Sequence, residues 1–157
     1  MNTFIAGKMG EVLAFARVGI DTLTKGREAF LKIFDASVLD AAADELKKLE
    51  ASILALAKNE GRAEKVESGA QETANKVTKM RDTYLGGKWN EASEVLEWMG
   101  FYTGAALVHW YLLSGAGKAH GPAQLEELST EALRFYTSLF AQDEKLLAKI
   151  GASESEE

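Results

Sequence analysis

The stretch WMGFYTGAALVHWYLLSGAG, Trp98–Gly117, decides how this chain is interpreted, because it contains no lysine, arginine, aspartate or glutamate. A helix of this length rises about 30 Å, which is the thickness of the hydrocarbon core of a membrane. Its aromatic residues gather toward its two ends, as they do in the interfacial belts of membrane helices. The stretch therefore has the length and the aromatic pattern of a membrane span.

Two further features of this stretch leave a second interpretation open. Gly100 and Gly104 form a G-x-x-x-G pair, which puts two small residues on one helix face and lets another helix approach closely. A central helix of a soluble four-helix bundle is also apolar on all sides, however, and would tolerate His109 and the nearby Glu97 more readily than a span would. Taken alone, the stretch predicts a membrane span or a buried bundle helix equally well.

Composition predicts an all-α fold. The 157 residues suit one domain, and alanine, leucine, glutamate and lysine, which are all good helix formers, dominate a chain with a single proline, Pro122. The net charge of −6 argues against nucleic acid as a partner, because phosphate binding needs a basic face. The absence of cysteine excludes disulfides and thiolate metal sites.

The pattern along the chain divides it into four segments. We expect amphipathic helices over residues 1–60, interrupted near Gly26, and a polar helical connector over residues 61–88. We expect a transmembrane helix over residues 89–117, followed by a C-terminal helix and an acidic tail over residues 118–157. The connector is too polar to bury much surface, which favours a solvated helix or a mobile arm.

Two short stretches resemble subunit g of mitochondrial F-type ATP synthases. The sequence FARVGI, Phe15–Ile20, is similar to an aromatic-Ala-Lys-Val-x-Leu stretch of that family. Glu94-Val95-Leu96 and Phe101-Tyr102-Thr103-Gly104 resemble its single membrane helix. The order of amphipathic helices, polar stretch and late span also agrees. In the family, a glutamate follows the glycine that matches Gly104, whereas this chain has Ala105.

The resemblance implies a non-catalytic accessory subunit of the ATP synthase membrane region that supports dimer assembly in the mitochondrial inner membrane. Its partners would be other membrane subunits and lipid, and a slight basic excess before the span would place the N-terminal side in the matrix. The residues expected to make helix-packing contacts are Gly100, Phe101, Tyr102 and Gly104. The alternative that the residues leave open is a soluble helical bundle that acts as a binding or scaffold module.

No catalytic residue, cofactor or metal site is predicted, and no small-molecule substrate is expected. Glu91, Glu94 and Glu97 share one helix face, but neither histidine has the glutamate three residues earlier that a ferritin-like di-iron site requires. For His109, we expect a hydrogen bond to a neighbouring helix rather than haem ligation, since no second histidine accompanies it on that helix.

Overall fold

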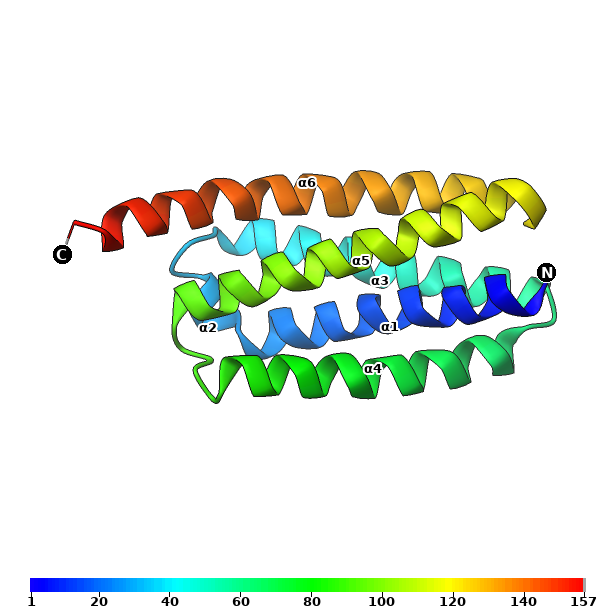
Figure 1. Ribbon diagram of the computed structural model, residues 1–157, viewed down its shortest axis with the longest axis horizontal. Helices are drawn as coiled ribbons and strands as arrows, with labels where there is room; N and C mark the ends of the chain where they lie inside the picture. The colour runs from blue at the N-terminus through cyan, green and yellow to red at the C-terminus, as the bar shows by residue number, and fades with distance from the viewer. Residues whose placement is uncertain (157) are drawn as a thin grey trace.

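The first helix of the bundle, α1 (Thr3–Lys25), lies among the others and contacts every later helix except the last. In a computed structural model, which describes residues 1–156, five long helices lie side by side and each runs back along the one before it (Figure 1). The remaining elements are α2 (Arg27–Phe30), α3 (Ala36–Asn59), α4 (Ala63–Leu85), α5 (Ala92–His120) and α6 (Ala123–Glu154). No strand occurs in the described part, so the predicted all-α fold is confirmed.

Helix α1 can occupy this position because it is apolar on more than one side and carries two glycines where neighbours come close. A Cβ on Gly10 would lie 2.7 Å from the carbonyl oxygen of Val66, so the backbones of α1 and α4 approach directly there. A Cβ on Gly19 would collide with the hydroxyl of Tyr102 on α5. The glycines therefore set the spacing of α1 against both neighbours.

The predicted helix boundaries agree closely with the structure in the first half of the chain. Gly26 ends α1, as expected, and the helix predicted from residue 38 to about residue 58 is α3. The polar connector forms α4, which buries a narrow stripe against α1 and ends at Gly86 with φ of 55°, a left-handed value that suits glycine. The acidic tail is helical through Glu154, and Glu157 lies outside the described residues.

The expected transmembrane helix finds no support. Among residues 1–156, no helix combines the length and apolarity needed to cross a membrane. The uncharged stretch is the middle of α5, and its glycines, Thr103 and His109 dilute its hydropathy. One side of α5 packs instead against α1 and α6, where Trp98, Tyr102 and Trp110 are buried. Packing within the bundle therefore explains the apolar inner side of α5.

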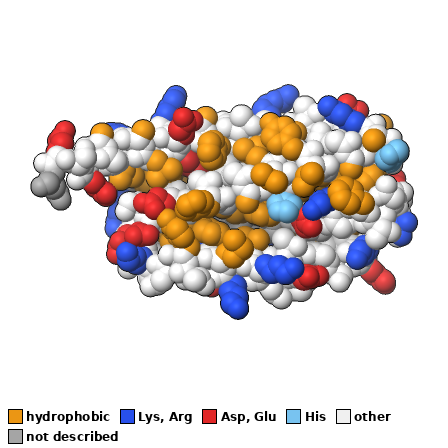
Figure 2. Space-filling view, in the orientation of Figure 1, with side chains coloured by type: hydrophobic (Ala, Val, Ile, Leu, Met, Phe, Trp, Pro, Cys, Tyr) orange, Lys and Arg blue, Asp and Glu red, His pale blue; other side chains and the backbone are white. Residues whose placement is uncertain are grey.

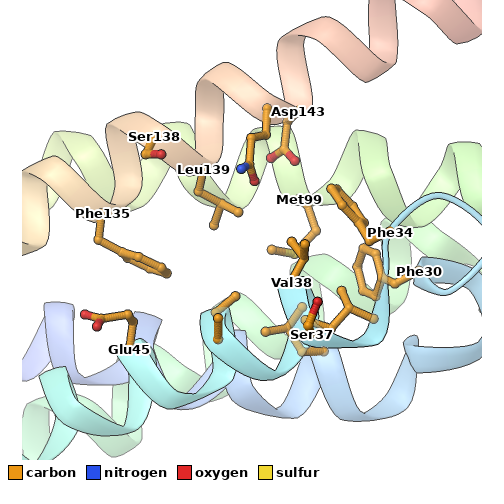
Figure 3. Close-up of a pocket in the computed structure, with 15 residues that line it drawn as sticks. Phe30, Phe34, Ser37, Val38, Glu45, Met99, Phe135, Ser138, Leu139 and Asp143 are labelled. Atoms are coloured by element: carbon orange, nitrogen blue, oxygen red, sulfur yellow. The ribbon is translucent and has the colours of Figure 1, made fainter.

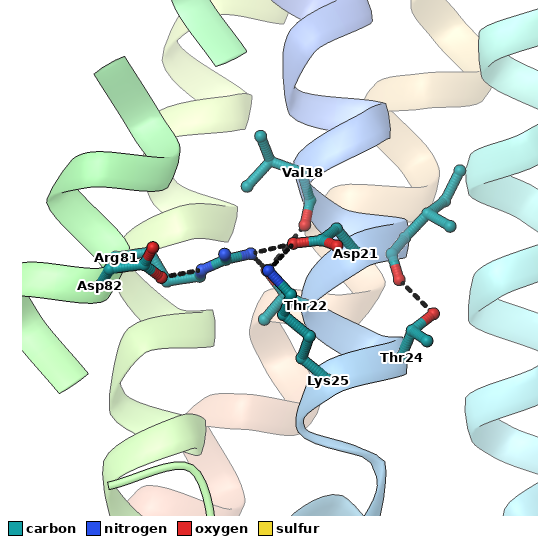
Figure 4. Close-up of polar contacts among 8 residues, drawn as sticks. Val18, Asp21, Thr22, Thr24, Lys25, Arg81 and Asp82 are labelled. Carbon is teal, nitrogen blue, oxygen red and sulfur yellow. Dashed lines mark hydrogen bonds and ion pairs between the residues drawn. The ribbon is translucent and has the colours of Figure 1, made fainter. Parts of the chain in front are cut away.

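A buried arginine joins α4 to α1 (Figure 4). The Arg81 side chain is fully buried, and its Nη1 donates hydrogen bonds to Asp21 Oδ2 at 2.7 Å and to Thr22 Oγ1 at 3.1 Å. Its Nε donates to Asp82 Oδ1 at 2.9 Å, and the guanidinium lies 4.9 Å from the ring centre of Trp89. Partial burial of Asp21 works against ionisation, but hydrogen bonds from Arg81 and Lys25 outweigh it and lower its pKa.

We predict that Arg81→Ala lowers the free energy of unfolding by about 3 kcal/mol, because it removes a fully buried side chain together with its hydrogen bonds and leaves the buried Thr22 facing a gap. The matched control is Lys79→Ala, which removes an exposed cation from the same helix and should cost less than about 0.5 kcal/mol. Urea denaturation of the two variants measures both values. Equal losses of unfolding free energy in the two variants would show that the hydrogen bonds of Arg81 contribute no more than an exposed charge does.

Candidate functional site

The outward side of α5 carries a stripe of large apolar side chains that no other helix covers. Phe101, Val108, Tyr111 and Leu112 have exposed fractions between 48% and 61%, and we call these four residues the outer face of α5. Their spacing of seven, three and one residues keeps them on one side of the helix. Figure 2 shows hydrophobic side chains gathered over α5 and along its border with α4.

The apolar surface continues onto α4. The ring of Tyr84 lies 5.3 Å from that of Phe101 in an edge-on arrangement, and Met80 is 63% exposed. The Tyr84 hydroxyl also donates a hydrogen bond to Glu97. Exposed apolar side chains that gather on one surface in this way make it a candidate interaction site.

The inner side of α5 is held by a buried hydroxyl pair. The Tyr102 hydroxyl donates a hydrogen bond to the carbonyl oxygen of Phe15 on α1, and it lies 3.3 Å from the hydroxyl of Tyr136 on α6. Burial raises the pKa of both phenols, so both stay neutral at physiological pH. Tyr102 therefore ties α1, α5 and α6 together inside the chain.

The four residues predicted to make helix-packing contacts lie on different sides of α5. Tyr102 faces the core and Phe101 faces outward. A Cβ on Gly100 would meet Leu147 at 3.6 Å, and one on Gly104 would meet Phe140 at 3.9 Å, so both glycines face α6 of the same chain. Contact of these residues with another chain stays a prediction; within the chain, the glycine pair seats α6.

The two residues that argued against a span both have roles on the surface of the bundle. His109 Nδ1 lies 2.6 Å from Glu11 Oε2 of α1, outside hydrogen-bonding geometry, and its ring centre is 5.1 Å from that of Phe15. His109 therefore contacts the neighbouring helix α1, but its Nδ1 does not make the predicted hydrogen bond. Glu97 accepts the bond from Tyr84 described above. No group of three potential metal ligands occurs within residues 1–156.

A second candidate site, which the sequence did not predict, lies between α2, α3, α5 and α6. It is a pocket of about 390 Å³, here called the Asp143 pocket (Figure 3). Its walls are largely apolar and include Phe30, Phe34, Val38, Met99, Phe135 and Leu139. A pocket of this size falls at the lower end of the range for small-molecule sites.

Asp143 is the unusual residue of this pocket. Its side chain is only 2% exposed, and its Oδ2 has no hydrogen-bond partner. Burial raises its pKa to about 7, and a smaller effect from the Thr103 hydroxyl opposes the rise. That hydroxyl has one proton, which it donates to the carbonyl oxygen of Met99 at 2.7 Å, so the carboxylate lacks a firm donor.

The sequence contained a signal for Asp143. The buried residues of α6 recur every three to four positions, at Leu125, Leu128, Ala132 and Tyr136, and the same register continues through residue 139 to residue 143. An aspartate in the apolar register of an amphipathic helix becomes buried on folding, and its carboxyl group then needs a hydrogen-bonding or charged partner.

The comparisons with known proteins do not extend these observations. No family model, no curated protein and no solved structure matches the chain. The similarity to subunit g therefore rests on the two short stretches around Phe15–Ile20 and Glu94–Gly104 alone.

We predict that Asp143 makes the fold less stable as the pH rises. In the unfolded chain the carboxyl loses its proton near pH 3.8, but in the folded chain it does so only near pH 7. Below pH 4 it is protonated in both states and costs nothing. Between pH 4 and pH 7 its ionisation favours unfolding, by up to about 4 kcal/mol in total.

Asp143→Asn should therefore be more stable than the parent above pH 7, with a gap that closes as the pH falls toward 4. Chemical denaturation at a series of pH values measures the gap. Glu144→Gln, an exposed change at the next position, is the matched control and should follow the parent. A constant difference between Asp143→Asn and the parent at every pH would contradict this account.

Proposed function

We propose that this chain is a non-catalytic helical-bundle module whose function is assembly, and that two copies associate through the outer face of α5. The observation that carries the proposal is that α5 is apolar on both sides while the bundle covers only one. Full burial of each large apolar side chain contributes about 1.5–3 kcal/mol. Four such side chains left open on one helix favour a partner that covers them.

The outer face is complementary to itself, which favours a second copy as the partner. In an antiparallel pair of α5 helices related by a two-fold axis near Val108, positions equally far before and after Val108 oppose each other. Phe101 then opposes Gly115 of the other copy, Tyr111 opposes Ala105, and Val108 opposes Val108 of the other copy. Phe101 and Tyr111 thus lie level with small residues of the other copy, which allows the two helices to pack closely.

Charges at the two ends of the stripe agree with the same arrangement. Glu97 lies before the stripe and Lys118 lies after it, and both side chains are exposed. The two-fold axis near Val108 brings Glu97 of one copy to the height of Lys118 of the other, and the symmetry does this twice. Opposite charges at the edges of an apolar interface favour this orientation over the parallel one, in which like charges would meet.

The prediction of an ATP synthase accessory subunit, with its inner-membrane location and membrane partners, stays a prediction. Under it, the outer face of α5 would contact a helix of another subunit instead of a second copy. The scaffold alternative drawn from the residues and the present proposal agree that the chain acts through helix contacts.

We predict that the purified chain is a dimer at micromolar concentration and that Val108→Glu makes it monomeric, because this change places two carboxylates on the two-fold axis. The control is Leu31→Glu, which changes another exposed apolar residue, directly after α2 and outside the interface. Sedimentation velocity gives the mass in solution, and circular dichroism shows that both variants fold.

A parent chain that sediments as a monomer at 100 µM would overturn the proposal, because even a weak dimer with a dissociation constant of about 10 µM would form at that concentration. So would a dimer that Val108→Glu leaves intact. If the monomeric chain instead binds purified ATP synthase through Phe101 and Val108, the subunit prediction replaces the dimer.

A further inference from the structure

We propose that the Asp143 pocket binds a hydrophobic amine, with the Asp143 carboxylate as the counter-ion of its ammonium group. This inference is independent of dimer formation, since none of the outer-face residues of α5 lines the pocket. It also departs from the expectation that the chain takes no small molecule.

Helices of the bundle and the turn that holds Phe34 form the walls of the pocket. The aromatic rings of Phe30 and Phe34 close one end, next to Met99 of α5, and α3 supplies Val38 and Ala42. From α6, Phe135 and Leu139 complete the apolar lining. In Figure 3, Asp143 extends from α6 toward this space beside Met99. The apolar body of a ligand would therefore be surrounded by side chains from four helices.

The unpartnered carboxyl points to a cationic ligand. Asp143 Oδ2 is buried and receives no hydrogen bond, and the Thr103 proton is already used by Met99. A buried carboxylate without a donor is costly, and a bound ammonium group supplies both the opposite charge and the missing donors. The pocket thus contains the anion of an ion pair, the Asp143 carboxylate, and the space for a cation.

The other lining residues argue against an acid as the ligand. The lining contains no lysine, arginine or histidine, and Glu45 is its only other ionisable residue. Both charges that face the pocket are therefore negative, which repels a carboxylate and attracts an ammonium. The three phenylalanines of the lining favour a cation as well, because the faces of aromatic rings attract positive charge.

The test measures binding of three probes of equal chain length, octylamine, 1-octanol and octanoate, to the full chain at pH 8 by isothermal titration calorimetry. We expect octylamine to bind at least about tenfold more tightly than either other probe. Asp143→Asn should remove this preference, whereas the matched control Glu144→Gln should keep it. Lowering the pH from 8 to 6 should weaken octylamine binding, because Asp143 then takes up a proton.

A second variant shows that the cavity itself is the site. Ala42→Leu fills part of the pocket without touching Asp143, so it should weaken binding of octylamine at pH 8 while the chain stays folded. The proposal is overturned if octanoate or octanol binds as well as octylamine, or if Asp143→Asn leaves the preference unchanged. Absence of binding by all three probes at millimolar concentration would overturn it too.

Discussion

The bundle depends on the burial of α1 along its length. A helix can be covered on three sides only if its neighbours approach closely and its few polar groups find partners. Gly10 provides the close approach, since the backbone of α4 lies where a Cβ would be. Arg17 provides the other condition: its guanidinium bonds Glu50 of α3 at 2.8 Å and Glu67 of α4 at 2.7 Å. The other helices pack around α1.

The outer face of α5 and the Asp143 pocket follow from the order of packing around α1. Because α5 lies against α1 on one side and α6 on another, its third side stays largely exposed, and only Tyr84 of α4 packs against Phe101 there. The pocket arises where α6 passes α2 and the start of α3, far from the paired centre of the bundle. We propose the first as a surface for a partner and the second as a site for a small molecule, so the two proposals concern different kinds of recognition.

The sequence predicted the helices well, because helix formers, capping residues and apolar spacing act locally. Gly26 and the limits of α3 needed no tertiary information. The role of α5 could not be predicted, because an uncharged helix is compatible with lipid, with a protein interior or with both. Only the helices that pack against it in the folded chain distinguish these surroundings. The glycine pair was expected to face another chain, yet α6 of the same chain lies against Gly100 and Gly104. Asp143 was detectable in the register of α6, but its pocket depends on four separate helices.

The fit of Tyr102 over Gly19 has a consequence for how this chain can change during evolution. The phenol hydroxyl occupies the volume that any side chain at position 19 would need, and it also bonds the backbone of Phe15. Alanine at position 19 therefore requires either a shift of the Tyr102 ring or a smaller residue at position 102. Related chains should show these two distant positions varying together, and a residue larger than glycine at the first should accompany loss of the tyrosine at the second.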